Sequence, residues 1–270
     1  MKQDYVIAIP SYKRSKTVKE KTLATLTKLN VDPNKVTIFV GDLDQEKEYR
    51  NVLSDTQYKN IVVGVPGMGA IRNFIQQYYP EGTYILNLDD DLIEIHYRKN
   101  EKVLESITNL DDVVKAGFEA CEKNNANLWG VYAASNPFFM HDRVAVGLYY
   151  VIGSMWGCIN HHGDKYNVSL DDKEDYERSL KYYIADGAVC RLDYITVKSN
   201  YYKEPGGMQV TRTSERIEES AKILAERYPD YCTMYYRKTT GHAELKLRDK
   251  TKSNKESSVS LGDSLENFFM

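Results

Sequence analysis

The first hundred residues alternate between short apolar runs and longer stretches whose apolar residues recur at helical spacing. The short runs are rich in Val, Ile and Tyr, which is typical of buried strands, and they cover residues 5–9, 36–40, 61–65 and 84–88. The longer stretches predict helices over residues 15–30, over 46–53 and from the glycine turn 66–69 to residue 79. Strands that alternate with helices pair in parallel through right-handed crossovers, so we expect an α/β fold around a mostly parallel central sheet.

The second half of the chain is less regular. Helices are predicted over residues 111–124, 172–183 and 214–228, and strands over 128–134, 144–152, 188–199 and 231–236. Residues 204–207 are Glu-Pro-Gly-Gly and predict a loop. A polar stretch then leads to a short apolar end. The expected organisation is therefore one domain over residues 1–248, a flexible linker over 249–263 and a docking peptide over 264–270.

Composition narrows the class of protein. Hydrophobic residues make up 42% and charged residues 28%, which allows a sizeable core. The net charge of −3 excludes a global basic field, so contact with nucleic acid would need local basic patches. The four cysteines are widely spaced without a zinc pattern, which predicts buried thiols in a reducing compartment. Since neither a signal peptide nor a membrane span is recognisable in the sequence, a cytoplasmic protein is expected.

Three consecutive acids, Asp89, Asp90 and Asp91, follow the predicted strand over residues 84–88. Ligands bind at the carboxyl ends of strands in α/β sheets. Carboxylates packed together repel each other, and a hard divalent cation such as Mn2+ or Mg2+ removes that repulsion and can hold a diphosphate. Asp89 and Asp91 share one side at i and i+2 if strand geometry persists, so they are the candidate metal ligands. The alternative is a solvated acidic turn.

Further motifs surround this cluster in a fixed order. The first strand leads into Pro10-Ser11-Tyr12-Lys13-Arg14, the second is followed by Asp42, a glycine turn leads to Arg72-Asn73, and Glu174-Asp175 comes later. Together with an Asp-x-Asp motif at Asp89–Asp91, this set resembles glycosyltransferases of the GT-A type over roughly residues 1–210. The resemblance implies a GT-A-like, Rossmann-type fold that binds a nucleotide-sugar, in the first place a UDP-sugar, and a metal-dependent transfer of the sugar.

The resemblance also implies contacts to the donor. A base would stack on Tyr12, a phosphate would pair with Arg14, and Gly206-Gly207 would belong to a loop that closes over the diphosphate. The candidate donor-binding residues are Pro10, Tyr12, Arg14, Asp42, Arg72, Asp90, Gly206 and Gly207. The alternatives are a loop tyrosine, solvated or ion-paired arginines, an aspartate that forms a turn and an ordinary surface turn.

Catalysis would need a carboxylate that removes the proton of an acceptor hydroxyl. Asp175, with Glu174 beside it, is the candidate base of an inverting enzyme; in a retaining enzyme it would hold the donor sugar instead. The alternative is an acid that stabilises the dipole of the following helix. A late histidine often completes such a metal site, which makes His242 the candidate third ligand and the His161-His162 pair the alternative.

A finer resemblance concerns the acceptor. The motifs at residues 9–14, 173–176 and 202–207 are similar to a branch found in phages that glycosylates hydroxymethylated pyrimidines in DNA, which would place the protein in a phage-infected bacterial host. A local basic rim would contact the DNA backbone, and its candidates are Lys198, Lys203, Arg212, Arg237 and Lys238. The apolar end of the chain, with Leu265, Phe268 and Phe269, is similar to tails that bind a replication sliding clamp.

Other functions remain open from the sequence. The same site could serve a glycan or protein acceptor. A nucleotidyltransferase also uses carboxylates and metal, but it needs a basic phosphate loop that Lys13, Arg14 and Lys16 supply only in part. A binding module without activity would tolerate Asn at positions 89 and 91. The tail could also pack on its own domain.

Overall fold

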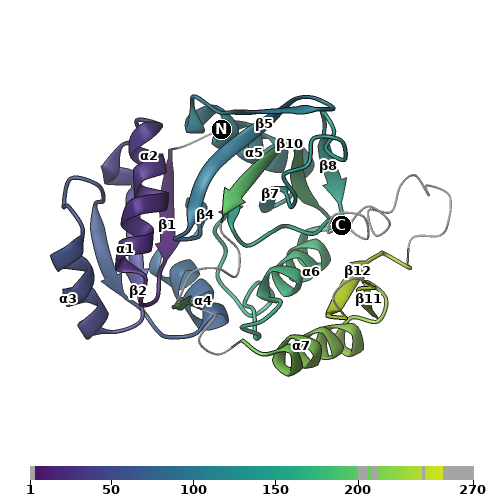
Figure 1. Ribbon diagram of the computed structural model, residues 1–270. Coiled ribbons are helices and arrows are strands. Elements are labelled where there is room, and N and C mark those ends of the chain that lie inside the picture. The colour runs from purple at the N-terminus through teal and green to yellow at the C-terminus, as the bar shows by residue number, and fades with distance from the viewer. Residues whose placement is uncertain (1–3, 200–205, 208–211, 239–240, 252–270) are drawn as a thin grey trace.

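The computed structural model describes residues 4–199, 206–207, 212–238 and 241–251 (Figure 1). Its centre is one ten-stranded sheet, in which the main path runs β3-β2-β1-β4-β9-β7-β10-β5-β6 and β8 pairs with β10. A second sheet of two strands, β11 and β12, lies apart from it. The alternation of strands and helices thus gives the α/β architecture that the sequence predicts.

The first four strands form the parallel half of the sheet. They are β1 (Tyr5–Pro10), β2 (Val36–Val40), β3 (Asn60–Val63) and β4 (Tyr84–Leu88), and every pair of neighbours among them is parallel. The helices between them are α1 (Ser15–Val18), which continues through a π turn (Lys19–Leu23) into α2 (Ala24–Lys28), then α3 (Leu43–Val52) and α4 (Met68–Tyr78). Parallel strands end at the same edge, so this half brings the ends of β1, β2 and β4 together.

The other half of the sheet is mixed. β9 (Met155–Ile159) runs antiparallel between β4 and β7 (Leu128–Tyr132), and β7 pairs in parallel with β10 (Val189–Ser199). The remaining strands, all antiparallel to their partners, are β5 (Leu92–Asn100), β6 (Val103–Ser106) and β8 (Val144–Gly147). β5, β6 and β9 were not predicted, because charged residues interrupt β5 and β6, and Gly157 and Cys158 weaken the β pattern of β9.

The prediction of a strand over residues 144–152 is wrong in its second part. β8 ends at Gly147, and the chain then runs as a connector to β9. We call its last five residues, 150–154, the connector segment. The remaining elements are α5 (Leu110–Asn124), which is capped by Asn109, α6 (Glu174–Asp186), α7 (Ser214–Arg227), β11 (Cys232–Tyr236) and β12 (Ala243–Leu247).

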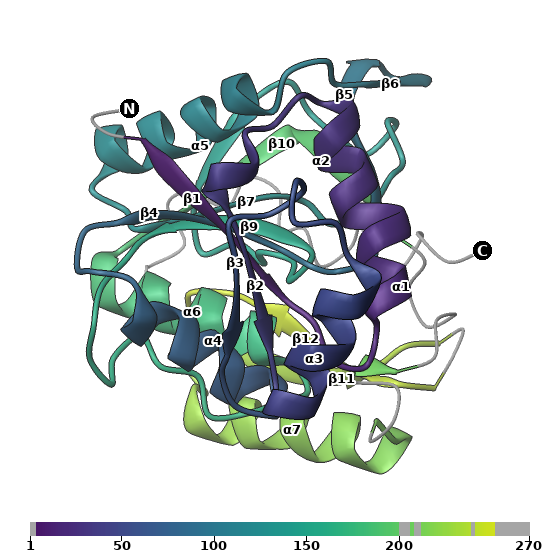
Figure 2. The same cartoon turned by 90° about the vertical axis from the view of Figure 1, so that its left-hand side faces the viewer.

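Helices cover both faces of the sheet. One hydrophobic core joins the sheet to α1, α2, α3 and α5, and another joins its opposite face to α4 and α6. Figure 2 shows α5 above the sheet and α4, α6 and α7 below it. A third core packs α7 and the β11–β12 hairpin against α6, so the last part of the described chain is attached to the fold through that helix.

The chain stays in contact with this domain just beyond residue 248. The Tyr183 hydroxyl donates to Asp249, and the Lys250 amide donates to the Asp230 carbonyl over 2.9 Å. The predicted linker and docking peptide otherwise lie outside the described residues. Among the described helices, none combines the length and the apolar character that crossing a bilayer requires.

The indole of Trp129 on β7 provides a test of the core. A methyl group on Gly117 of α5 would lie 2.2 Å from an indole carbon, and one on Gly157 of β9 would lie equally close to the indole nitrogen. Helix propensity alone favours alanine over glycine inside α5 by about 1 kcal/mol, whereas overpacking costs about 1–3 kcal/mol. The difference between these two contributions is a net loss of up to about 2 kcal/mol, so we expect Gly117→Ala to lower the free energy of unfolding by about 1 kcal/mol in urea titrations.

Lys115→Ala is the control, because Lys115 lies on the exposed side of the same helix. That change should leave stability within about 0.5 kcal/mol of the parent protein. A stabilised Gly117→Ala variant would contradict the packing of Trp129 against α5.

Candidate functional site

The candidate site lies at the edge where β1, β2 and β4 end. Pro10 is the last residue of β1, and the Ser11 amide still donates to the Phe39 carbonyl of β2 over 2.9 Å. Asp42 follows β2, and Asp89, Asp90 and Asp91 occupy the turn between β4 and β5. The structure therefore brings together motifs that the sequence separates by as many as eighty positions.

Each member of the aspartate cluster faces an arginine. Asp90 is buried, accepts from the Ser11 hydroxyl over 2.6 Å, and pairs with Arg14 Nη1 at 3.1 Å. Asp91 Oδ2 lies 3.8 Å from the same nitrogen, and Asp89 Oδ1 lies 2.7 Å from Arg72 Nη2. Burial raises the pKa of Asp89 and of Asp90, and the neighbouring arginine opposes the rise in each case. The cluster is a partly compensated anionic site.

The cluster fits a cation that is bound partly by the protein and partly by oxygen atoms of its substrate. Within the described part of the chain, no three His, Cys, Asp or Glu side chains converge to hold a metal ion. A magnesium-type ion needs only one or two protein carboxylates when phosphate oxygens and water supply the rest. Asp89 and Asp91 offer such a pair of hard oxygen ligands, so the donor set fits Mn2+ or Mg2+ together with a diphosphate.

The structure does not bring His242 together with these ligands. His242 lies in the β11–β12 hairpin, where its carbonyl accepts from the Arg237 amide over 2.9 Å. The alternative pair, His161 and His162, is held at Glu81, with His161 Nδ1 2.8 Å from its carboxylate. Both predictions for a third, histidine ligand therefore lack support from the arrangement of the described residues.

Gln45 links Asp42 to the turn that follows β1, where Tyr12 lies. Gln45 donates to both oxygens of Asp42, from its amide over 2.9 Å and from its side chain over 2.8 Å, and accepts from the Lys13 amide over 3.0 Å. These hydrogen bonds lower the pKa of Asp42, which caps α3. The Tyr12 ring packs against Gly41, where a methyl group would come within 3.0 Å of it. Asp42 thus forms a turn, as the alternative expects, while its contact with a donor stays a prediction; sequence reasoning missed Gln45.

The two glycines predicted to act as a lid lie against the same turn. The Gly207 amide donates to the Tyr12 carbonyl over 3.0 Å, and Gly206 and Gly207 have φ of 86° and 58°. A methyl group on Gly206 would lie 2.7 Å from the Lys13 carbonyl oxygen, and one on Gly207 would lie 2.9 Å from the Arg14 guanidinium carbon. Only glycine combines this backbone with so close an approach, and the contact places both residues beside the aspartate cluster.

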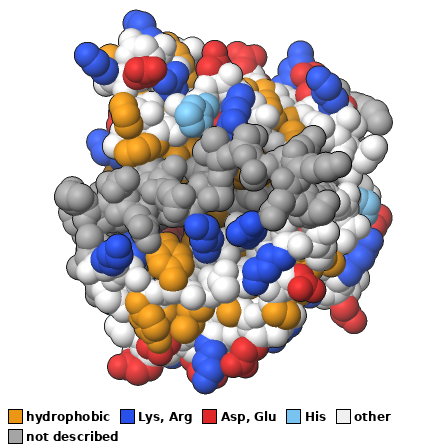
Figure 3. Space-filling view, turned by 90° about the vertical axis from the view of Figure 1, so that its right-hand side faces the viewer, with side chains coloured by type: hydrophobic (Ala, Val, Ile, Leu, Met, Phe, Trp, Pro, Cys, Tyr) orange, Lys and Arg blue, Asp and Glu red, His pale blue; other side chains and the backbone are white. Residues whose placement is uncertain are grey.

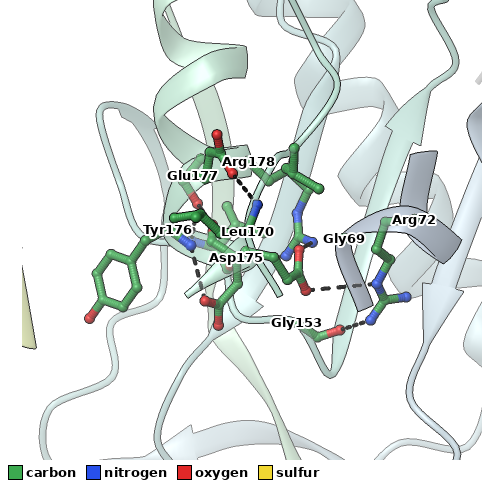
Figure 4. A network of polar contacts seen from close by, with 12 residues as sticks. Gly69, Arg72, Gly153, Leu170, Asp175, Tyr176, Glu177 and Arg178 are labelled. Atoms are coloured by element: carbon green, nitrogen blue, oxygen red, sulfur yellow. Dashed lines mark hydrogen bonds and ion pairs between the residues drawn. The ribbon is translucent and has the colours of Figure 1, made fainter. Parts of the chain in front are cut away.

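Arg72 connects the cluster to α6. Its side chain is almost fully buried, and besides Asp89 it contacts the Gly153 carbonyl at 3.3 Å and Glu174 Oε1 at 3.7 Å. Figure 4 shows Arg72 pointing from α4 toward Gly153 and the start of α6. The start of α4 itself is occupied by Asp171, which accepts from the Gly69 amide over 3.0 Å. Arg72 is therefore ion-paired, as the alternative expects, and its contact with a donor stays a prediction.

Glu174 and Asp175 differ in their surroundings. Glu174 is buried, and Arg178 Nη1 binds it at 2.6 Å while stacking on Trp156, 3.9 Å from the ring centroid. Burial raises the pKa of Glu174, and Arg178 and then Arg72 oppose the rise. Asp175 is only partly buried and accepts from the Tyr150 hydroxyl and from the Tyr176 amide. Glu174 is thus engaged by arginines, which leaves Asp175 as the better candidate base.

The connector segment is the part of the site that sequence reasoning missed. Tyr150 donates to Asp175, the Val151 carbonyl accepts from Arg178, the Gly153 carbonyl accepts from Arg72, and the Ser154 carbonyl accepts from the Asp89 amide. These contacts use the backbone or a single hydroxyl, so the sequence carries no motif for them beyond the Gly153-Ser154 pair between two apolar runs.

Comparisons with known proteins add a likeness at the level of structure alone. No family model and no curated protein matches the chain. The chain is similar to a structure described as a mycobacterial protein, with a TM-score of 0.48, 9% identity and coverage of 92% of this chain and 84% of that one. It is also similar to glucosyl-3-phosphoglycerate synthase from Mycobacterium tuberculosis in complex with Mn2+, UDP-glucose and phosphoglyceric acid, with the same TM-score and identity and coverage of 93% and 91%. At such identity, function has to be inferred from the site itself.

The pair Arg178–Glu174 provides a test of the buried network. Without Arg178, Glu174 keeps only the longer contact to Arg72, so Arg178→Met should lower the free energy of unfolding by about 3 kcal/mol near neutral pH. The charge of Arg178 is the largest interaction that opposes the raised pKa of Glu174, so removing Arg178 should raise this pKa further. A raised pKa means that the folded state holds the proton more tightly, so the loss should be smaller at pH 5 than at pH 8.

Urea titrations at both values of pH measure this difference. Arg50→Met is the matched control, because Arg50 pairs with Glu46 at the same i,i+4 spacing and a similar distance of 2.7 Å but is half-exposed. That change should cost less than about 0.5 kcal/mol at either pH. Equal losses for the two variants would contradict the network.

Proposed function

We propose that this protein is a metal-dependent glycosyltransferase that moves a sugar from a nucleotide-sugar, in the first place a UDP-sugar, to an acceptor hydroxyl. The observation that carries the proposal is the placement of a candidate base, Asp175, beside an aspartate cluster that fits a cation and a diphosphate. One buried chain of contacts, Asp89–Arg72–Glu174, links the cluster to the residue before Asp175. The donor and the acceptor would therefore react at one edge of the sheet.

Different residues of the site have different roles in the proposed reaction. Asp89 and Asp91 would hold a divalent cation, which would supply positive charge to neutralise the leaving diphosphate. Tyr12 presents an aromatic ring beside Gly41 for the base, and Arg14 holds the cluster from the side on which Gly206 and Gly207 pack. In an inverting reaction Asp175 removes the proton of the acceptor hydroxyl as that oxygen attacks the anomeric carbon. In a retaining reaction Asp175 would hold the donor sugar instead.

We further propose that the acceptor is a hydroxymethylated pyrimidine in DNA, which would place the protein in a phage-infected bacterial cytoplasm. The resemblance of the motifs around Pro10, Glu174 and Gly206 supports this acceptor. On the face shown in Figure 3, several Lys and Arg side chains lie across the middle, with Asp and Glu side chains nearby. Three of the candidate rim residues pair with carboxylates, however: Lys198 with Glu94 at 3.6 Å, Arg212 with Asp172 at 2.8 Å and Arg237 with Glu244 at 3.4 Å. The charge of the rim is thus partly compensated.

A transfer assay tests both the glycosyltransferase activity and the DNA acceptor. The protein is incubated with Mn2+, a panel of UDP-sugars and DNA that contains hydroxymethylcytosine or hydroxymethyluracil, and the nucleosides are weighed by mass spectrometry. We expect a mass gain of one sugar on the modified base, and its loss on chelation of the metal. UDP release without a mass gain would move the acceptor to a glycan, a protein or water. No turnover of any nucleotide-sugar would overturn the proposal.

Variants tested in the same assay distinguish a specific role of the aspartate cluster from the general effect of removing one negative charge. Asp91→Asn should lower turnover at least about 100-fold, since metal stabilisation of the leaving group is worth several kcal/mol. Asp44→Asn is the control, because that side chain is almost fully exposed at the start of α3. Full turnover by Asp91→Asn would instead contradict a role of Asp91 in holding the metal.

We also propose that the end of the chain, with Leu265, Phe268 and Phe269, docks the protein on a replication sliding clamp. Its apolar composition after a polar stretch supports this role. Removing the residues after Thr251, the last described one, should spare transfer to short DNA and abolish binding to a clamp in surface plasmon resonance. A truncated protein that unfolds at lower urea would show that the tail packs on its own domain instead.

A further inference from the structure

The connector segment lies beside the candidate base, Asp175, at the start of α6. The Ser179 hydroxyl donates to the Asp175 carbonyl over 2.7 Å and accepts from the Val151 amide over 3.0 Å, so the segment follows the first turns of α6. A methyl group on Gly153 would lie 3.4 Å from Glu174 Oε1 and 3.9 Å from Asp175 Cβ. The backbone of the segment is thus fixed against α6, which sets the position from which Tyr150 reaches Asp175.

The two carboxylate oxygens of Asp175 accept hydrogen bonds from different donors, one from the backbone and one from a side chain. Oδ1 accepts from the Tyr176 backbone amide over 3.0 Å, and Oδ2 accepts from the Tyr150 hydroxyl. Burial, followed by the charge of Asp175, raises the pKa of Tyr150 well above its usual range. The hydroxyl therefore stays protonated and acts as the donor, so the carboxylate is held at two points and its rotation is blocked.

The ring of Tyr150 is itself fixed. It stacks on Tyr176 with 4.2 Å between centroids and 26° between planes. The hydroxyl of Tyr176 points to a different acid, Glu244 of β12, which it meets at 3.1 Å and which Lys173 also binds at 2.8 Å. The two stacked rings thus share one environment but direct their hydroxyls to different carboxylates.

We propose that Tyr150 is a positioning residue, which holds the carboxylate of Asp175 in the orientation from which it acts on the acceptor hydroxyl. The proposal rests on the proposed function, because it assigns Tyr150 a task in that reaction. Tyr150 acts through Asp175 and contributes no proton to the reacting atoms. Displacing a reacting group by about 1 Å can cost about 100-fold in rate, so one hydroxyl is enough to matter.

Tyr150→Phe tests the proposal, since it removes the hydroxyl and keeps the stacked ring. In the full-length protein with Mn2+ and the UDP-sugar that the wild type turns over best, we expect kcat to fall about 10- to 100-fold. The KM for the donor and the dissociation constant of UDP, measured by calorimetry, should stay within about twofold. Tyr166→Phe is the matched control, because it removes a hydroxyl that donates over 2.8 Å to Asp186, at the other end of α6 from Asp175, and its kcat should stay within about threefold of the wild type.

A double-mutant cycle distinguishes positioning from a general structural effect. If Tyr150 acts through Asp175, the change to Phe should cost nothing further in an Asp175→Asn background. Additive losses, an unchanged kcat in Tyr150→Phe, or a Phe variant that no longer binds UDP would each overturn the positioning role while the proposed function stands. A wild type that turns over no nucleotide-sugar would overturn both.

Discussion

The burial of carboxylates at one edge of the sheet is the constraint on which the site depends. Asp90, Asp91 and Glu174 are each less than a tenth exposed, and unpaired charges at such depth would be strongly destabilising. Arg14, Arg72 and Arg178 compensate them, and Arg72 and Arg178 are themselves almost fully buried. Removing one partner of such a pair leaves the other uncompensated, so the acids and the arginines require each other.

This mutual requirement explains why distant parts of the chain meet here. Arg72 of α4 reaches Asp89 in the turn after β4, and Arg14 of the turn after β1 reaches Asp90, whereas Arg178 binds Glu174 within α6 and contacts the Val151 carbonyl of the connector segment. The contact to Asp91 is longer than those to Asp89 and Asp90, since Asp91 Oδ2 lies 3.8 Å from Arg14 Nη1. In the proposed reaction a cation would therefore join a site in which arginines already compensate part of the negative charge.

The sequence predicted the parallel half of the fold closely, because its strands are apolar runs bounded by turns. β2 and β4 match the predicted ranges residue for residue. Local composition also marks the aspartate cluster and the glycine pair, whose roles at a donor stay predictions. The sequence could not show which partners Asp42 and Arg72 have within the protein, because Gln45 and Glu174 meet them only in the folded state. The connector segment was missed, since backbone contacts leave no pattern of side chains.

The connector segment gives the site its internal order. It is held to Asp175 at Tyr150, to Arg178 at Val151, to Arg72 at Gly153 and to Asp89 at Ser154, so a shift at either end is transmitted to the other. Close-packed contacts of this kind deform little, because each displacement breaks a buried hydrogen bond. The distance between the candidate base and the aspartate cluster is therefore set by the length of this segment as well as by the sheet and helices on either side.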